Sequence, residues 1–336
     1  MIAWSKDDER LKEGISLWFG KFDEGRPRYG REPAFPREPW LAVMESGILR
    51  LPFDEKWGGL GQSLLTTMYV LEELGRCCRN TGLNFGITTH MVTTGVALQR
   101  FGSTALKDAH LPQVCAGTAV GTHAVTEPDS GSDALGMRTT ATADGDCYRL
   151  SGAKAFVGNG PVADLVVVYA RTEPAAGPLG VTAFLVARDT PGLTFGDPVE
   201  GTGLKSAPLC SLFLDDCRVP RTHILGRVGA GLLVLDHVRT WEILCCFIVG
   251  TGEIRRRLDR CVAYAGERST FGRSVGGFQA VAKRIVDMKI GLEMSRKWLY
   301  DTAEKFTAGR KVTADLATAK LVADRIAATL GLGRAA

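Results

Sequence analysis

The chain has 336 residues, a formal net charge of +4 and a pI near 8.6. Hydrophobic residues make up 45% and charged residues 23%, values that are ordinary for a globular protein and argue against a disordered chain. Arginine and lysine are scattered rather than clustered with aromatic residues, which argues against nucleic acid as a partner. The N-terminus lacks an apolar signal core and no stretch is long enough to cross a membrane. We therefore expect a soluble cytoplasmic protein without a membrane partner.

Nine cysteines occur in the chain, but none form a CxxC pair and none accompany histidines at zinc-ligand spacing. We therefore predict reduced thiols and no metal site. Four histidines, His90, His110, His223 and His237, show no triad or metal pattern, and we expect each on a helix surface or in a loop.

The first region, residues 1–117, has helical periodicity. One predicted helix in the stretch "SLLTTMYVLEELGRCC" places apolar residues along a single face, namely Leu64, Met68, Leu71, Leu74 and Cys78. Turn-rich segments such as "KWGGLG" separate the predicted helices. We predict an N-terminal helical domain over these residues.

The middle region, residues 118–228, changes to short alternating or β-branched runs such as "DLVVVYART" and "GVTAFLVAR". The dipeptide Asp144-Gly145 between two such runs is typical of a hairpin turn. We predict a mainly antiparallel, β-barrel-like domain here.

The last region, residues 229–336, returns to helical patterns. We predict long helices over residues 232–265, 278–306 and 313–330, with the loop "GERSTFGRSVGG" between the first two. The predicted fold class is therefore α+β: a helical domain, an antiparallel β domain and a C-terminal helical bundle.

The segment "HAVTEPDSGSDALG" begins at His123, at the entrance to the β region. Its hydroxyls at Thr126, Ser130 and Ser132 and its unhindered amides around Gly131 are typical of an anion site or of an ordinary capped loop. The segment resembles the first signature of the acyl-CoA dehydrogenase family, which reads hydrophobic-Thr-Glu-Pro-x-x-Gly-Ser-Asp. Four further stretches resemble the family in the same order: "VMESGILRLPFDEKWGGLGQS", "FGSTALKDAHLPQVCAGTAVG", "LSGAKAFVGNGPVADLVVVYART" and "RSTFGRSVGGFQAVAKRIVDM".

The resemblance implies the same three-part fold, with FAD bound between the β domain and the C-terminal bundle of a homodimer or homotetramer. It implies that residues 123–132 face the flavin, with His123 at their start, Val125 and Thr126 at the pyrimidine edge, and Ser132 near phosphate or the acyl thioester. The stretch Phe156, Val157 and Gly158 corresponds to residues beside the flavin ring.

Gly158 departs from the family pattern, because a hydroxyl usually stands there and only a backbone amide remains. Arg268, Phe271 and Gln279 match residues that hold the ADP half of FAD across a subunit interface. The arginine fork suits a diphosphate.

Glu242 opens the apolar stretch "EILCCFIVG", where an unpaired carboxylate is costly unless a partner or a function keeps it there. Some family members, resembling isovaleryl- and long-chain acyl-CoA dehydrogenases, carry their catalytic base at this helix position. The resemblance therefore implies Glu242 as the base, with Thr240 and Ser132 beside the substrate. The alternative is an ordinary ion pair between Arg239 and Glu242 on the helix surface.

Two further departures concern the acyl carrier and the end of the chain. Lys205, Pro208 and Leu209 replace the arginine and hydroxyls that usually precede the "VP" turn, so recognition of the acyl carrier is expected to be unusual. The chain stops before the family's Gln-x-x-Gly-Gly flavin loop and before the commonest position of its catalytic glutamate. An incomplete sequence, a naturally short protein and a degenerate function all remain open here.

The implied function is FAD-dependent α,β-dehydrogenation of an acyl thioester to the trans-2-enoyl thioester. The partners would be an acyl-CoA or an acyl carrier protein thioester, and an electron-accepting flavoprotein. The alternatives are a flavin- or acyl-binding relative without dehydrogenase activity, and a flavin oxidase or monooxygenase on the same fold.

Overall fold

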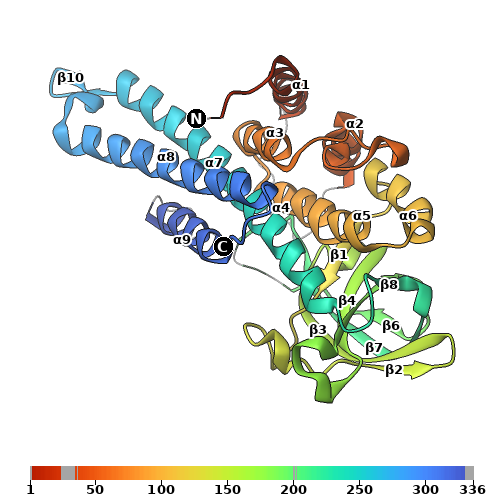
Figure 1. The fold of residues 1–336 in the computed structure, drawn as a ribbon. Coiled ribbons are helices and arrows are strands. Elements are labelled where there is room, and N and C mark those ends of the chain that lie inside the picture. The colour runs from red at the N-terminus through yellow and green to blue at the C-terminus, as the bar shows by residue number, and fades with distance from the viewer. Residues whose placement is uncertain (1, 24–34, 36, 200, 202, 330–336) are drawn as a thin grey trace. The chain divides into compact units, whose positions relative to one another are not determined.

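The computed structural model describes residues 2–23, 35, 37–199, 201 and 203–329. The predicted order of helices, a central β-sheet and further helices is confirmed (Figure 1). The chain forms two compact units. One comprises Met1–Tyr29, Ser63–Asn84 and Ile243–Ala336, and the other comprises Gly30–Gln62 and Phe85–Glu242.

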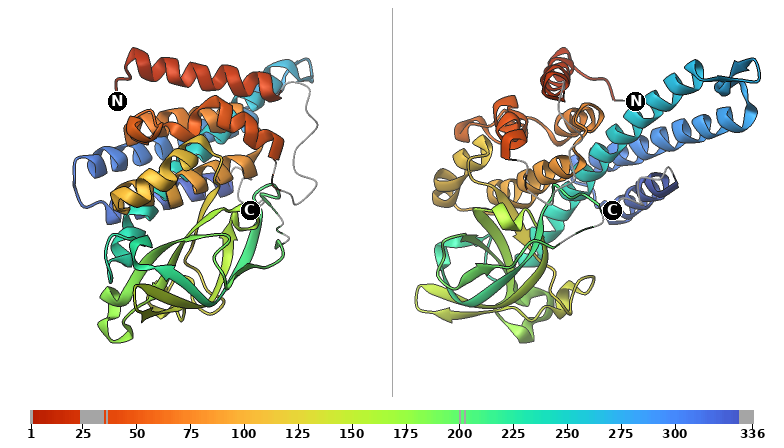
Figure 2. Two further views of the ribbon diagram at one scale, coloured as in Figure 1. Left: turned by 90° about the vertical axis from the view of Figure 1, so that its right-hand side faces the viewer. Right: turned by 180° about the vertical axis from the view of Figure 1, so that it is seen from behind.

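The second of these units contains an eight-stranded sheet in the order β6-β7-β3-β2-β4-β5-β8, with β1 paired to β4. Its strands are β1 (Gly121–Ala124), β2 (Thr140–Asp144), β3 (Cys147–Gly158), β4 (Leu165–Arg171), β5 (Val181–Ala187), β6 (Leu193–Phe195), β7 (Leu209–Pro220) and β8 (Ile224–Leu225). Most pairs are antiparallel, as predicted, whereas β1 and β2 each pair with β4 in parallel. The strands curl around an apolar core that includes Tyr148, Leu150, Phe184 and Leu212 (Figure 2).

The predicted hairpin at Asp144 is confirmed. β2 and β3 pair in antiparallel register up to Asp144 and Cys147, which leaves Gly145 and Asp146 as the turn. Gly145 has a φ of 60°, a left-handed conformation that a glycine adopts without steric cost.

Several helices of the same unit precede the sheet in the chain. They are α2 (Arg37–Ser46), the short turns η1 (Ile48–Arg50) and η2 (Glu55–Trp57), and α6 (Thr104–Ala116). A longer helical run starts as α4 (Thr81–Thr89), which belongs to this unit from Phe85 on, continues as a π-helix (His90–Val96) and ends as α5 (Ala97–Phe101).

The expectation that His90 lies on a helix surface or in a loop is wrong, because its side chain is fully buried. Its Nδ1 accepts a hydrogen bond from the Gly121 amide at 2.9 Å, and its Nε2 lies 2.9 Å from the Val114 carbonyl, to which it donates. Burial lowers the pKa of His90 to about 4, so the ring is neutral near pH 7. His90 therefore anchors the first residue of β1 to the π-helix.

The other unit is helical. It contains α1 (Lys6–Asp23), α3 (Leu64–Cys77), most of α7 (Gly231–Glu267), the hairpin strands β9 (Ser269–Thr270) and β10 (Arg273–Ser274), α8 (Gln279–Thr307) and α9 (Thr313–Thr329). The predicted helices over 232–265, 278–306 and 313–330 are thus present, although residue 330 lies outside the described part. The apolar face predicted for α3 is buried throughout.

Two glycines allow α3 and α7 to pack closely. A Cβ added at Gly75 would lie 2.0 Å from the Val249 carbonyl oxygen, and one added at Gly252 would lie 1.9 Å from the Glu72 carbonyl oxygen. These contacts leave no room for a side chain at either position. The sequence therefore needs glycine at both places for helix contact rather than for backbone flexibility.

A buried polar network links α3 to α8. The Glu72 carboxylate accepts hydrogen bonds from Arg296 Nη2 at 3.1 Å and from the Tyr300 hydroxyl at 3.0 Å. Glu72 is only 6% exposed, so its charge needs these partners. Among the helices in the described ranges, none combines the length and apolar character required to span a bilayer.

Candidate functional site

The residues predicted to form the site fall into two groups, one in each compact unit. The sheet-containing unit brings together the flavin-facing and substrate-facing candidates, which are His123, Val125, Thr126, Ser132, Phe156, Val157, Gly158, Thr240 and Glu242. The helical unit holds Arg268, Phe271 and Gln279.

Strand β1 sets the position of His123, and side chains from the π-helix fix that strand. Thr94 donates a hydrogen bond to the Thr122 carbonyl at 2.9 Å, next to the amide held by His90. The Thr122 hydroxyl in turn donates to the Gly158 carbonyl at the end of β3. A Cβ at Gly121 would lie 2.5 Å from the Thr94 side chain, so this close approach requires glycine. The start of β1 and the end of β3 are therefore held together.

His123 and Glu242 face each other across this site. His123 Nε2 lies 3.8 Å from Glu242 Oε1, and the two side chains are 19% and 26% exposed. Burial lowers the pKa of His123, the Glu242 carboxylate opposes that effect, and Arg239 adds to it. Among the described residues, the basic side chain within 4 Å of the Glu242 carboxylate is the imidazole of His123. The expected alternative, a surface pair between Arg239 and Glu242, is not formed.

Tyr169, on β4, also lies near the His123 ring. The two ring centroids are 6.4 Å apart with an edge-on geometry. The Tyr169 hydroxyl is buried and has no hydrogen-bond partner among the described residues, and the same holds for His123 Nδ1. Burial and the nearby Glu242 carboxylate both raise the pKa of Tyr169, so its hydroxyl stays protonated. His123 on β1 is thus flanked by ionisable side chains from two other elements, Glu242 on α7 and Tyr169 on β4.

A buried ion pair supports the loop that follows β1. Lys154 has no exposed side-chain surface and donates to Glu127 at 2.8 Å and to the Val125 carbonyl at 3.1 Å. The Glu127 carboxylate also accepts the Arg138 amide at 2.6 Å and the Thr139 amide at 3.0 Å. Burial raises the pKa of Glu127, but the hydrogen bonds outweigh it and hold the pKa below its ordinary value. Hydrogen bonds therefore hold Val125 and Glu127 in place, and the Thr126 carbonyl is held by the Ala155 amide.

The end of β3 exposes an aromatic ring. The register of β3 against β7 shifts between Lys154 and Val157, and such irregularities often redirect a side chain. Phe156 has a φ of 56° and is 65% exposed, whereas Val157 is buried in the core of the sheet. Val157 can therefore offer a ligand only its backbone. Phe156 is the side chain presented to solvent.

The polar candidates differ in whether their hydroxyls are free. The Thr126 and Ser132 side chains make no hydrogen bond to another described residue, and Ser132 is exposed. The Thr126 carbonyl accepts the Ala155 amide at 2.8 Å, which fixes its backbone. Thr240 is buried, and its hydroxyl donates to the Asp236 carbonyl at 3.0 Å. Thr126 and Ser132 can therefore both donate to a ligand and accept from it, whereas the Thr240 hydroxyl can only accept, because its proton is already donated.

The three candidates of the helical unit lie around the β9–β10 hairpin, where α7 ends and α8 begins (Figure 1). Arg268 is exposed directly before β9, and Gln279 is the exposed first residue of α8. Phe271 has a φ of 50° and is 91% exposed. An arginine, an amide and an aromatic ring are thus presented to solvent within one turn region.

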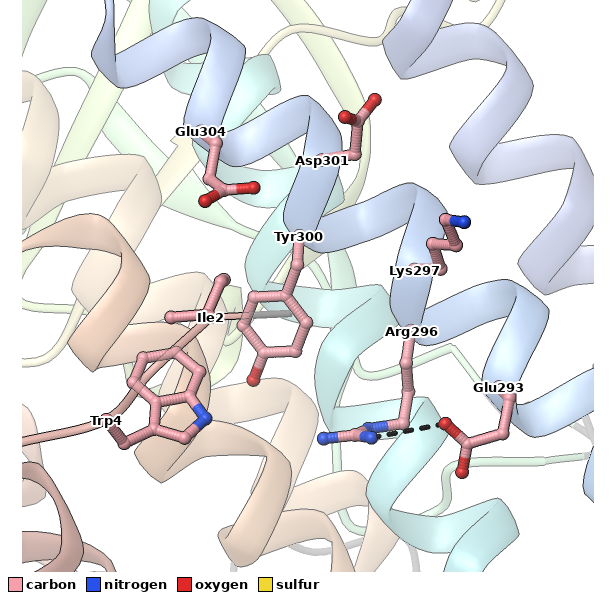
Figure 3. A pocket seen from close by; sticks show the side chains of 8 residues that line it. All are labelled: Ile2, Trp4, Glu293, Arg296, Lys297, Tyr300, Asp301 and Glu304. Atoms are coloured by element: carbon pink, nitrogen blue, oxygen red, sulfur yellow. Dashed lines mark hydrogen bonds and ion pairs between the residues drawn. The ribbon is translucent and has the colours of Figure 1, made fainter.

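The same unit has a hollow of about 450 Å³ between α8 and the N-terminal residues Ile2 and Trp4. Figure 3 shows Tyr300 and the paired Arg296 and Glu293 along its wall. None of the predicted site residues line it. Its lining carboxylates and cations offer no nucleophile or base with a defined target, so the candidate site remains the one around Glu242.

Three residues that shape the candidate site were not predicted from the sequence: His90, Lys154 and Tyr169. The role of Lys154 could have been inferred from the sequence. It lies on an alternating strand just before Phe156, and a lysine side chain that points inward from such a strand needs a buried carboxylate as its partner. Nothing in the sequence indicated the roles of His90 and Tyr169, since these roles depend on neighbours distant in the chain.

Comparisons with protein families match the chain to three consecutive models: Acyl-CoA dehydrogenase, N-terminal domain over residues 23–118, middle domain over 122–217, and C-terminal domain over 229–331. The L-prolyl-[peptidyl-carrier protein] dehydrogenase of Serratia sp. (strain ATCC 39006) is 36% identical over 295 residues, which cover 88% of this chain and 76% of that protein. The mitochondrial isovaleryl-CoA dehydrogenase of Solanum tuberosum is 32% identical over 285 residues, covering 84% and 69%.

Solved structures of similar proteins share the fold. The FAD complex of PigA superimposes with a TM-score of 0.94 at 32% identity, covering 99% of this chain and 87% of that one. The prolyl acyl carrier protein oxidase AnaB has a TM-score of 0.93 at 32% identity, covering 96% and 86%.

Proposed function

The chain belongs to the acyl-CoA dehydrogenase family, and we propose that it uses FAD to convert an acyl thioester into the trans-2-enoyl thioester. The observation that carries this proposal is the position of Glu242. Its carboxylate lies against His123, on the strand that leads into the proposed flavin-facing loop. A carboxylate at this place can reach a substrate held against that loop.

The residues of the sheet-containing unit fit FAD. The unpartnered hydroxyls of Thr126 and Ser132 can donate to polar ring atoms or phosphate, and the exposed Phe156 ring can cover an aromatic ligand. The backbone at Gly158 offers an amide where the family's usual hydroxyl is absent. When bound, FAD supplies the acceptor for the hydride that leaves the β-carbon.

Glu242 acts in this proposal as the base that removes the α-proton. The thioester carbonyl makes that proton acidic, and the Glu242 carboxylate is partly exposed and free of a strong ion pair. The rigid backbone from Val125 to Glu127 keeps the loop in one shape, so the substrate and the base can meet in a reproducible geometry.

For the substrate, we propose a carrier-protein-bound prolyl thioester as the first candidate and an acyl-CoA as the second. Relatives of both kinds match this chain, and the prolyl-carrier dehydrogenase has the higher identity of the two. Lys205 supports the first candidate, because it is exposed and stands outside the family's usual pattern for the region before the "VP" turn. The cytoplasm is the proposed site of action.

We also propose that the protein assembles as a homodimer or homotetramer. Phe271 is exposed almost completely, so its ring is free to contact a neighbouring subunit. Arg268 and Gln279 beside it would then reach the diphosphate of FAD bound by a neighbouring subunit. Analytical ultracentrifugation of the flavin-loaded protein tests this, and a fully loaded stable monomer would refute it.

The central experiment compares wild type with Glu242→Gln by anaerobic stopped-flow absorbance. The panel contains prolyl-carrier protein, isovaleryl-CoA and butyryl-CoA, and the readout is bleaching of the flavin. We expect one thioester to bleach wild type, and the variant to bind FAD and thioester normally while bleaching at least about 100-fold more slowly. Bleaching within a few-fold of wild type would place the base elsewhere.

Two outcomes of this experiment would point to the alternative functions, a flavin-binding relative without dehydrogenase activity and a flavin oxidase. A flavin that no thioester reduces would indicate a binding relative without dehydrogenase activity. Reoxidation of the reduced protein by oxygen, followed with an oxygen electrode, would favour an oxidase, a possibility supported by the similarity to a prolyl carrier protein oxidase. Reoxidation only by an electron-transferring flavoprotein or a dye would favour a dehydrogenase.

A further inference from the structure

We infer that His123 is a positioning residue for Glu242, and that its neutral ring donates Nε2–H to the carboxylate and holds it toward the substrate. The inference rests on the proposed function of Glu242 as the base. It assigns His123 a role beyond the flavin-facing one implied by its place in the signature.

The direction of the contact follows from the chemistry of the two groups. An ionised carboxylate only accepts hydrogen bonds, so the ring nitrogen that faces Glu242 is the one that carries the proton. A neutral imidazole has one N–H, which makes His123 Nδ1 the bare nitrogen. Nδ1 is buried and has no partner among the described residues. A lone pair is the less costly group to leave there, because buried N–H groups are almost always paired.

The contact can tighten without rearrangement of the backbone. At 3.8 Å it exceeds hydrogen-bond length, and catalytic hydrogen bonds are often long in structures without a ligand. β1 is held by His90 and Thr94 and cannot shift easily, so rotation of the Glu242 side chain is the simplest way to close the gap.

Burial keeps the His123 ring neutral, and the charged groups around it act in opposing directions. Glu242 and Arg239 face it from α7, and Tyr169 faces it from β4. Lys154 on β3 is occupied by Glu127. Burial is the largest influence and lowers the pKa of His123, while Glu242 and Arg239 act in opposite directions. A neutral donor stabilises the carboxylate without neutralising it, so Glu242 can still accept a proton.

Three substitutions at His123 test the geometry. Glutamine can place its amide where Nε2–H lies, asparagine can mimic only Nδ1, and phenylalanine keeps the ring without a donor. We expect His123→Phe and His123→Asn to reduce the flavin about 10–100-fold more slowly, the loss typical of one hydrogen bond to a charged group. We expect His123→Gln to stay within about threefold of wild type. His110→Gln, on α6 with its ring against His223, is the matched control and should be unchanged.

A merely structural role predicts a different pattern. It would lower flavin occupancy and thermal stability in all three variants and would not distinguish glutamine from asparagine. Occupancy, the flavin absorption spectrum and the Kd for the thioester are therefore measured alongside the rate. Equal rates for the Gln and Asn variants, or a Phe variant within twofold of wild type, would refute the inference.

A second measurement does not depend on turnover. ¹⁵N NMR of protein labelled at histidine reports which ring nitrogen carries the proton, and His123 is identified by loss of its signals in His123→Gln. We expect the Nε2–H form in wild type. Because Glu242 raises the pKa of His123 and Arg239 lowers it, Glu242→Gln should shift the titration of His123 to lower pH and Arg239→Gln to higher pH. An Nδ1–H form, or a titration that neither variant moves, would overturn the assignment.

The two hypotheses fail in different ways. If no thioester reduces wild-type flavin, the proposed function fails, while the NMR measurement still decides the contact between His123 and Glu242. If wild type is active and the ring protonation is as expected but the Phe variant is unimpaired, the positioning role fails and the proposed function stands.

Discussion

Lys154 lies beneath the proposed flavin-facing loop and binds both the carboxylate of Glu127 and the carbonyl of Val125. The lysine has no exposed side-chain surface and the glutamate side chain is 5% exposed. A buried pair of this kind adds little net stability compared with an apolar replacement, but loss of one partner leaves an uncompensated charge. The pair therefore specifies the shape of the loop.

The first prediction concerns the difference between losing one partner of this buried pair and replacing both. Lys154→Met should lower the free energy of unfolding by about 3–5 kcal/mol, because Glu127 keeps a buried charge without its cation. The double variant Lys154→Met, Glu127→Leu should recover much of the stability but not the flavin affinity. The exposed pair Arg149–Asp216 is the control, and Arg149→Ala should cost less than about 1 kcal/mol. Urea unfolding and flavin titration measure both quantities, and normal flavin binding by the double variant would contradict the role in shaping the loop.

A second prediction concerns the stability of the fold at low pH. Hydrogen bonds hold the pKa of Glu127 below its ordinary value of 4.5, so the ionised form stabilises the fold. That contribution is present above pH 4.5 and is lost as the pH falls through the lower pKa of the folded state. Glu127→Gln should therefore show a shallower loss of melting temperature than wild type below pH 4.5, as measured by differential scanning fluorimetry. Parallel curves for the two proteins would rule this out.

A third prediction concerns His90. Burial lowers its pKa from 6.5 to about 4, so the unfolded chain takes up a proton between these values and the folded chain does not. Stability should therefore be full above pH 6.5 and decline as the pH falls toward 4. His90→Asn should unfold more easily at pH 7, because it cannot bond both Gly121 and Val114, and it should lose that part of the pH dependence. A variant with the same slope as wild type would assign the acid sensitivity to other groups.

Gly158 allows a fourth prediction. A Cβ at this position would lie 3.2 Å from Phe85 Cε1, so serine fits only if the Phe85 ring moves by a few tenths of an ångström. Gly158→Ser, which restores the hydroxyl usual in the family, should cost about 1 kcal/mol of stability. Adding Phe85→Leu should relieve that cost. Thermal melts of the single and double variants check this, and an undiminished cost in the double variant would exclude the Phe85 contact as its cause.

The fifth prediction tests the proposed FAD contact of the helical unit. Arg268→Ala should lower FAD retention during dialysis while leaving the circular dichroism spectrum unchanged, because its guanidinium is exposed and would bind a diphosphate. Arg284→Ala, at an exposed arginine on α8, removes the same charge elsewhere in the same unit and serves as the control. Equal retention by the two variants would remove Arg268 from the binding site.

Much of the fold was determined by the sequence itself. The apolar spacing from Leu64 to Cys78 and the turn at Asp144-Gly145 depend on residues only a few positions apart, and the structure contains the helix and hairpin that they predict. The family signature was equally local, since it lies in one uninterrupted stretch after His123. Periodicity and turn preference act over short distances along the chain, so a single sequence records them.

The tertiary structure alone decided which of these residues meet. Glu242 was predicted on an apolar helix face with Arg239 as its alternative partner, yet its neighbour is His123, from a strand far earlier in the chain. His90 was expected at a surface and is instead buried beneath that strand, where it fixes the strand's first amide. Such contacts depend on how strands and helices pack, and packing brings together residues whose separation in the sequence carries no periodic signal. The sequence therefore specified the candidate base, and the fold determined the ring that faces it.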